Sequence, residues 1–173
     1  MNNMKELAEL LFNSAIRVCK RFNVYAVRNG RKGWNMDFQA YNKIFICNDA
    51  IKNTMAAEVV IGYEFKVKYP AYRGTFLSCI EELSFRLDGE EIPKEDVYFC
   101  LNNKQFLLDE LKDCFKEYWF IRDKAVIQIR KAGGIGKGEH KVKAFMKHRI
   151  PYTGYFGEYL VLDSDVTKTL IAQ

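Results

Sequence analysis

Two histidines are the side chains in this sequence best suited to metal binding or proton transfer. His140 and His148 lie eight residues apart in a stretch that alternates like a single strand. Because a strand rises about 3.3 Å per residue, the pair shares a face but is separated by ~26 Å and cannot bind one metal ion together. We expect His140 to be exposed where the strand begins. We expect His148 to be partly buried and hydrogen-bonded beside Val142, Ala144 and Met146, with catalysis as the less favoured alternative.

A glycine cluster at residues 133–138 has the composition of a phosphate-binding loop. Such a loop must open a helix so that its backbone N–H groups point at the anion. Here a strand-like segment follows the glycines, and the sequence Gly-Lys-Ser or Gly-Lys-Thr does not occur. We therefore interpret the cluster as a glycine-rich hairpin loop between Ile129 and Val142.

Acidic side chains gather beside predicted turns, and paired carboxylates are the groups that hydrolyse glycosidic bonds. They are Glu81, Glu82, Glu90, Glu91, Glu95 and Asp96. Acids that flank turns are usually solvated, so hydrolysis by these residues is the less favoured interpretation. The sequence also lacks a Gly-x-Ser-x-Gly motif, a His-Glu-x-x-His motif and Cys/His ligand spacing. The chain alone is poorly equipped for catalysis, and we expect neither a metal nor a cofactor in it.

A basic stripe runs along the segment that contains the histidines. Its residues are Lys141, Lys143, Lys147 and Arg149 with Phe145 among them, and Lys66 and Lys68 would join if their strands were neighbours. Basic residues with aromatic neighbours form grooves for single-stranded nucleic acids. One phenylalanine is a poor stacking platform, so we favour an ordinary solvated sheet face.

Two aromatic loops follow predicted strands, at residues 69–74 and 150–157. Tyrosine, arginine and phenylalanine on loops are typical of protein interfaces and of pockets for sugar or flavonoid rings. The predicted interface or pocket-wall residues are Tyr69, Tyr72, Arg73, Tyr152, Tyr155 and Phe156. The alternative is that these side chains fold back over the end of the domain.

The elements that position these residues change in type along the chain. Apolar residues recur at three- and four-residue steps over 3–22, which predicts an amphipathic helix. Residues 28–37 are basic and contain glycine and asparagine, which is typical of a linker. We therefore divide the chain into a helical N-terminal extension with its linker, 1–36, and a main domain, 37–173.

Beyond residue 40 the apolar period becomes two, which indicates strands. Predicted strands are 43–48, 61–69, 83–87, 97–101, 119–120, 125–130, 140–150 and 159–162, with hairpin-type turns at Asp88-Gly89 and Asn102-Asn103. One short helix is expected near 107–114, with Leu107, Leu108 and Leu111 buried. Short strands with frequent turns predict an all-β antiparallel sandwich of the immunoglobulin or fibronectin type.

Composition restricts the cellular context. The 173 residues are 49% hydrophobic and 28% charged, with a net charge of +5, which is ordinary for a globular domain. Five cysteines without Cys-x-x-Cys spacing, and the absence of a secretory signal, lead us to expect reduced thiols and a cytoplasmic location. No apolar run is long enough to span a membrane.

The order of several segments resembles the beta subunit family of bacterial C-glycoside deglycosidases. The resemblance rests on residues 62–74, Leu77-Ser78, 87–93, 131–140 and Ile150-Pro151-Tyr152, and it covers roughly 41–170. Residues 1–36 look like an addition to the family pattern. No single motif is catalytic, so the specificity lies in the ordered series.

This resemblance implies an accessory β-sandwich subunit that pairs with a TIM-barrel alpha subunit. The complex would be a carbon–carbon lyase that separates a 3-oxo sugar from an aromatic, flavonoid-type aglycone. The alpha subunit would carry the base and a divalent metal, expected to be manganese, and this chain would support it and wall its active-site mouth. The resemblance implies neither a nucleic-acid nor a membrane partner.

The residues themselves leave two other functions open. One is a stand-alone carbohydrate- or polyphenol-binding sandwich without catalysis. The other, less favoured, is a nucleic-acid-binding β domain that uses the 141–149 stripe.

Overall fold

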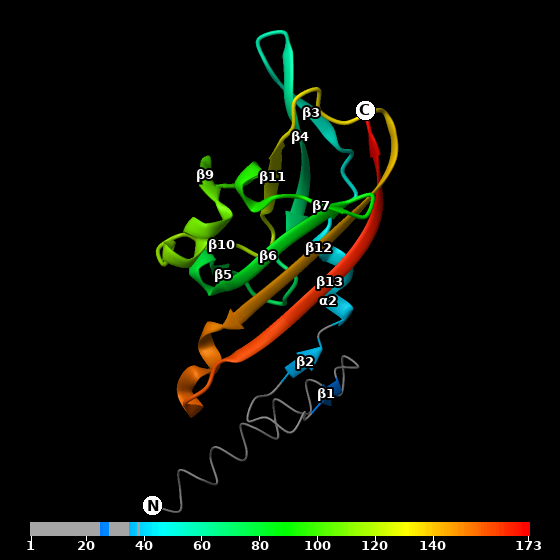
Figure 1. Cartoon of the computed structure of the whole chain (residues 1–173). Helices are drawn as coiled ribbons and strands as arrows, with labels where there is room; N and C mark the ends of the chain where they lie inside the picture. The colour runs from blue at the N-terminus through cyan, green and yellow to red at the C-terminus, as the bar shows by residue number, and fades with distance from the viewer. Residues whose placement is uncertain (1–24, 28–34, 38) are drawn as a thin grey trace, which may run out of the picture.

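The computed structural model describes the backbone of residues 25–27, 35–37 and 39–173, and the side chains of 41–154 and 157–173. The helix predicted at 3–22 lies outside these residues. Within them the chain is mostly antiparallel β, which confirms the predicted all-β sandwich. Figure 1 shows the long strands β12 and β13 side by side along the molecule and the β3–β4 hairpin projecting at the top.

The described residues form two main sheets and one short ribbon. The six-stranded sheet has the order β1 (Tyr25–Val27), β2 (Asn35–Asp37), β13 (Leu160–Ala172), β12 (Gly138–Ile150), β6 (Ile80–Leu87) and β7 (Glu90–Glu91). The five-stranded sheet has the order β3 (Lys52–Ala56), β4 (Val59–Lys68), β11 (Lys124–Arg130), β8 (Val97–Leu101) and β9 (Lys104–Leu107). The ribbon pairs β5 (Thr75–Phe76) with β10 (Tyr118–Trp119). Every pairing between these strands is antiparallel except that of β13 with β2, and an isolated parallel bridge joins Ile51 to Ala172.

Helical segments connect or precede these strands. They are α2 (Gln39–Phe45) and the 3₁₀ helices η1 (Leu77–Cys79), η2 (Lys94–Asp96), η3 (Leu108–Asp113) and η4 (Pro151–Phe156). The helix expected near 107–114 is therefore η3. Its Leu111 is buried as predicted, but Leu107 is exposed because it ends the edge strand β9 before the helix begins.

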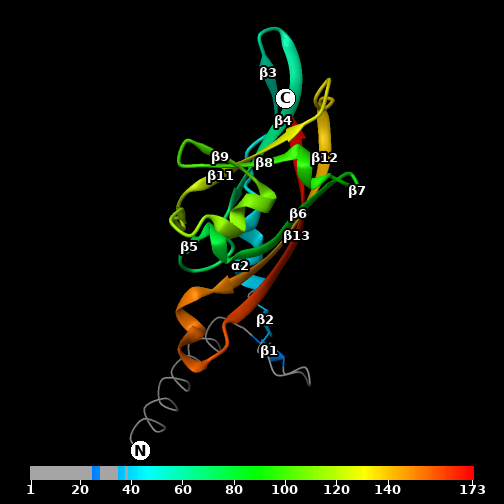
Figure 2. The ribbon, with the colours of Figure 1, turned by 60° about the vertical axis from the view of Figure 1, so that its left-hand side comes forward.

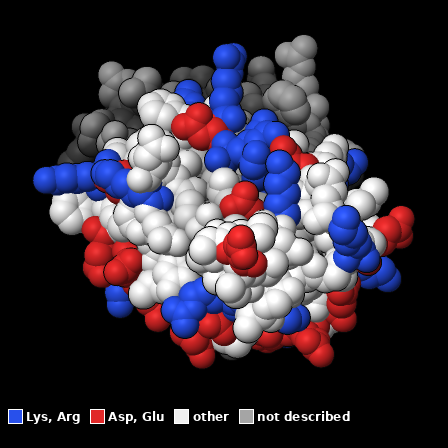
Figure 3. Space-filling model, turned by 90° about the horizontal axis from the view of Figure 1, so that it is seen from above, with Lys and Arg blue, Asp and Glu red and all other residues white. Residues whose placement is uncertain are grey.

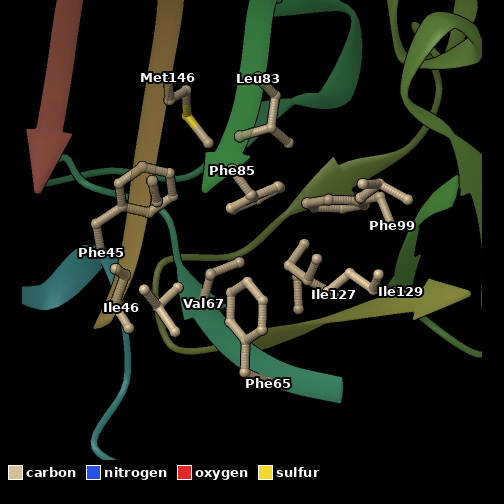
Figure 4. Close-up of a cluster of buried hydrophobic side chains, with 14 of the residues drawn as sticks. Phe45, Ile46, Phe65, Val67, Leu83, Phe85, Phe99, Ile127, Ile129 and Met146 are labelled. Carbon is tan, nitrogen blue, oxygen red and sulfur yellow. The ribbon is translucent and has the colours of Figure 1, made fainter. Parts of the chain in front are cut away.

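The core lies between the two sheets and contains the inward residues of both. Phe65 of β4 meets Phe85 of β6 edge to face, with ring centroids 5.4 Å apart. Figure 4 shows these rings among aliphatic side chains from β4, β6, β11 and β12. The predicted turns are also present: Asp88 and Gly89 take positive φ (52° and 93°), which tight hairpin turns require.

Two strand predictions were wrong because the local pattern was ambiguous. Residues 43–48 begin as the helix α2, because a short apolar run such as 44–47 does not reveal its period. The last strand extends from Leu160 to Ala172, far beyond the predicted 159–162. Its inward face includes the buried Ser164. It also includes the half-buried Lys168, whose ammonium group donates to the Ile46 carbonyl. These polar residues mask the alternation of apolar and polar side chains.

The glycine cluster is not a hairpin loop, because β11 and β12 belong to different sheets and the segment crosses between them. It packs on the base of the β3–β4 hairpin. Asn53 of β3 donates to the Ile135 carbonyl and accepts from the Ile135 N–H. A Cβ atom on Gly134 would lie 2.3 Å from the Asn53 side chain, so this close approach requires glycine.

His140 is only partly exposed, contrary to the expectation, because both ring nitrogens are engaged. Nδ1 lies 2.7 Å from an Asp88 oxygen and Nε2 lies 2.9 Å from the Gly136 carbonyl. The Asp88 carboxylate raises the pKa of His140 above its usual value. His140 therefore ties the glycine segment to the β6–β7 turn.

The close approach of β4 to β11 at Gly62 generates a prediction. A Cβ atom on Gly62 would lie 2.0 Å from the Ile129 carbonyl oxygen, so Gly62→Ala must displace β4 from β11. We expect a loss of roughly 2–3 kcal/mol in the free energy of unfolding, measured by urea denaturation. Gly136→Ala meets open space and is the control, with an expected change within about 0.5 kcal/mol. Equal midpoints for the two variants would contradict the contact.

Candidate functional site: an arginine–tyrosine cluster

Three of the predicted site residues meet at one end of the sandwich. The rings of Tyr72 and Tyr152 lie 6.0 Å apart at 74°, and the Arg73 guanidinium carbon lies 5.5 Å from the centre of each. Tyr72 is 47% exposed and Tyr152 is 36% exposed. The cluster therefore presents two aromatic rings and one cation to a partner or ligand, a combination that contributes strongly to interfaces.

Prolines bring the two loops together. Pro70 follows the last residues of β4 and the next residue, Ala71, is buried, so the loop turns outward only at Tyr72. On the other side Pro151 starts η4 directly after β12. Thr153 then fixes that loop, since its hydroxyl donates to the Ile150 carbonyl and accepts from the Leu160 N–H.

Tyr69 lies beneath the cluster and not on the surface. It is 1% exposed, and its ring packs on Trp119 with centroids 5.6 Å apart. Its hydroxyl is hydrogen-bonded to Nδ1 of His148, 2.5 Å away. His148 is fully buried, more deeply than predicted, and its hydrogen bond is of the kind expected. Among the described residues its Nε2 atom has no hydrogen-bond partner.

Burial sets the protonation states of these groups. It lowers the pKa of His148 to about 4, since a buried imidazolium would lose its hydration. It also raises the pKa values of Tyr69 and Tyr152 above the ordinary tyrosine range. At neutral pH all three side chains are therefore uncharged, and Arg73 carries the positive charge of the cluster.

The sequence analysis missed an aromatic group next to the cluster. Phe76 and Tyr118 pack edge to face at 5.1 Å on the β5–β10 ribbon, and Phe120 lies 4.7 Å from Tyr118. A Cβ atom on Gly74 would touch the Tyr118 ring, so the loop of Tyr72 and Arg73 lies against this group. The signal was the run of three aromatic residues at 118–120, interpreted only as a strand.

A second arginine–tyrosine contact extends the surface beside η4. The Arg149 guanidinium carbon lies 5.7 Å from the Tyr159 ring centre, and its Nε lies 3.1 Å from Glu81. The pairing of β6 with β12 slips next to this point, where Glu81 is the extra residue. The roles predicted for Tyr155 and Phe156 stay predictions, because their side chains are outside the described residues.

The predicted basic stripe does not form a groove. Lys143 pairs with Asp165 at 2.9 Å, Arg149 contacts Glu81, and the strand neighbours of Lys147 are both acidic. Lys66 and Lys68 belong to β4 in the other sheet, so they do not extend the stripe. At the end of the molecule seen from above, Lys and Arg side chains likewise lie among Asp and Glu side chains (Figure 3). This arrangement favours an ordinary solvated face.

Other features of the described residues bear on cofactors and membranes. No three His, Cys, Asp or Glu side chains there lie close enough to bind a metal ion together. Four cysteines in that part of the chain are free thiols, and Cys47 and Cys79 are buried. No helix there has both the length and the apolar character needed to cross a membrane.

The two histidines generate a prediction about pH. Because the pKa of His148 falls from 6.5 to about 4 on folding, its stabilisation is present above pH 6.5 and is lost as pH falls through 4. We expect the free energy of unfolding of the wild type to fall by roughly 3 kcal/mol more than that of His148→Gln over this interval.

His140→Gln is the control, because the pKa of His140 is shifted in the opposite direction. The raised pKa of His140 gives stability that is present below pH 6.5 and lost at higher pH. Parallel pH curves for wild type and His148→Gln, from chemical denaturation, would refute the prediction.

Comparisons with known proteins agree in one family. The model of the C-glycoside deglycosidase beta subunit family matches residues 41–152. A C-glycoside deglycosidase beta subunit of Eubacterium cellulosolvens is 34% identical over 84 residues, which are 49% of this chain and 57% of that protein. One from Microbacterium trichothecenolyticum is 32% identical, covering 62% of this chain and 82% of the relative.

A third relative is also a beta subunit, but of a deglycosidase with a different named substrate. The 3'-dehydrocarminate deglycosidase beta subunit of a Microbacterium species is 31% identical over 57% of this chain and 74% of its own length. This chain spans little more than half the length of the Eubacterium relative but larger shares of the two Microbacterium proteins. Since the family match includes both loops of the cluster as far as Tyr152, this chain belongs to the C-glycoside deglycosidase beta subunit family.

Proposed function

We propose that this chain is the accessory subunit of a heteromeric C-glycoside deglycosidase and that the Tyr72–Arg73–Tyr152 cluster contacts its catalytic partner or the aglycone. The observation that supports the proposal is the exposed cluster itself, formed from two loops within the family match. A subunit role requires such a surface, because a beta subunit acts through another chain.

The partner we propose is a TIM-barrel alpha subunit that carries the catalytic base and a divalent metal, with manganese as the expected ion. We assign the metal to the partner because the family resemblance implies it there. Burial raises the pKa values of Tyr69 and Tyr152, so these two hydroxyls stay protonated at neutral pH and do not offer a base. This division of labour fits the charges and geometry of the cluster.

The substrate class we propose is a 3-oxo C-glycoside with an aromatic aglycone. A ketone at C3 acidifies the proton at C2, and loss of that proton permits the aglycone to leave by elimination, which makes the enzyme a carbon–carbon lyase. One relative is named for 3'-dehydrocarminate, a compound whose name also places the oxidation at the 3' position. Aromatic rings on a loop suit a planar aglycone by stacking and by excluding water.

Co-expression with the alpha subunit of the same organism tests the proposal. We expect a stable complex that cleaves a 3-oxo C-glycoside, with 3'-dehydrocarminate as one of the compounds assayed. The double variant Tyr72→Ala/Arg73→Ala should weaken the complex or lower its kcat/KM by about 10- to 100-fold, because the rings and the cation act together. The measurements are a binding titration and the release of aglycone.

A matched control is available on the five-stranded sheet, where Arg130 donates to the Tyr98 hydroxyl at 3.1 Å. Tyr98→Ala/Arg130→Ala removes a similar exposed pair and should leave binding and turnover unchanged. Unchanged behaviour of the Tyr72/Arg73 variant would remove the cluster from the proposal. Tight binding of glycoside by the isolated chain, without a partner, would instead favour a stand-alone carbohydrate- or polyphenol-binding module.

A further inference from the structure

The distal part of the β3–β4 hairpin is an exposed apolar arm at one end of the molecule. We define the arm as residues 55–61, Met-Ala-Ala-Glu-Val-Val-Ile, which contain a single charged side chain. Met55 is 61% exposed, Val59 is 65% exposed and Ile61 is 46% exposed. Figures 1 and 2 both show the hairpin extending past the ends of the neighbouring strands. Such a concentration of exposed aliphatic side chains indicates a covered surface in the assembled protein.

Aliphatic side chains occupy both faces of the arm. Met55 pairs with Val60 across the hairpin, and Ala56 pairs with Val59, and partners in an antiparallel pair share a face. The two pairs are consecutive, so they point to opposite faces. Ile61 has no partner on β3, because the register between β3 and β4 shifts there. A flat surface would cover one of these faces only, whereas a groove covers both.

The arm is held rigidly where it leaves the body. The N–H groups of Lys131 and Gly133 donate to the carbonyls of Ile61 and Val60, at 3.0 and 3.1 Å. The two hydrogen bonds between Asn53 and Ile135 hold the glycine segment against the other strand. A fixed arm loses little conformational entropy when it binds, which favours a docking role.

The tip also departs from ordinary turn chemistry. Ala57 has a φ of 53°, in the left-handed region where glycine or asparagine would be less strained. An alanine there keeps the tip apolar, which asparagine would not. Strained residues of this kind are found where binding constrains the sequence.

The free edge and the charge of the arm restrict the kind of partner that can cover it. A second copy of this chain would most simply add strand to strand along the free edge of β3, but the shifted register and the exposed Lys52 oppose edge pairing. Glu58 is the only charge on the arm, so an anionic lipid surface or a nucleic acid has no cation to contact there. An apolar groove on a larger protein remains as the complementary surface.

We infer that this arm inserts into an apolar groove of the alpha subunit and forms a second contact, separate from the Tyr72–Arg73–Tyr152 cluster. The inference rests on the proposed function, because it takes the alpha subunit as the partner. The arm lies within the family match at 41–152, as the cluster does.

The test measures the affinity of the full chain for the alpha subunit by titration. Met55→Glu/Val59→Lys places one charge on each face without changing the net charge, and we expect the Kd to rise about 100-fold. The control Ile44→Lys/Leu107→Glu alters two aliphatic side chains that are 40% and 38% exposed elsewhere, and its Kd should stay within about 2-fold of the wild type. Circular dichroism and thermal melting verify that both variants are folded.

The outcomes separate the two proposals. A wild-type Kd for the Met55/Val59 variant, with an intact wild-type complex, overturns the arm alone and leaves the accessory-subunit function standing. Failure of the wild-type chain to bind any alpha subunit refutes the proposed function first. Sedimentation of the chain alone is the last readout: a dimer that the Met55/Val59 variant dissociates would assign the arm to a contact between copies, against the inference.

Discussion

The hydrogen bond between Tyr69 and His148 joins the two sheets at the end where the arginine–tyrosine cluster lies. Tyr69 directly follows β4 of the five-stranded sheet, and His148 belongs to β12 of the six-stranded sheet. Both loops of the cluster begin within three residues of this pair, at Pro70 and Pro151. The buried pair therefore fixes how the exposed Tyr72 and Tyr152 face each other, since each lies only a few residues from it.

A neutral imidazole is a condition for this arrangement. Protonation of His148 would bury a charge beside aromatic rings, and the low pKa of about 4 expresses the cost of that state. The same burial raises the pKa values of Tyr69 and Tyr152 and keeps both hydroxyls protonated, so they act as hydrogen-bonding and stacking groups beside the Arg73 charge. Such groups recognise and position a partner or an aromatic ligand. Neither of these two tyrosines is ionised at neutral pH to abstract a proton.

The sequence predicted the layered β fold and the two aromatic loops because both depend on local signals, but it did not predict that the loops meet. Alternation marks β4 and β6, and prolines next to tyrosines mark the loops. It failed where tertiary context decides. Phe45 ends a helix that packs on β13 and β4, and the inward-pointing Lys168 donates a hydrogen bond to the Ile46 carbonyl. The family resemblance was confirmed, whereas the depth of Tyr69 required the packing of Trp119 from a distant ribbon.

The cluster and the arm require different partner surfaces, and this difference constrains the assembly. The cluster offers rings and a cation, which suit a partly polar surface or the plane of an aglycone. The arm offers aliphatic side chains on both faces, which suit a dry groove. The cluster follows the last residues of β4, whereas the arm includes its first three residues, so the remainder of the strand, 62–68, separates the two. A strand rises about 3.3 Å per residue, which spaces the contacts by roughly 25 Å. A small accessory chain that binds at two such separated points resists rotation on its partner, and loops that line an active-site mouth need that fixed orientation.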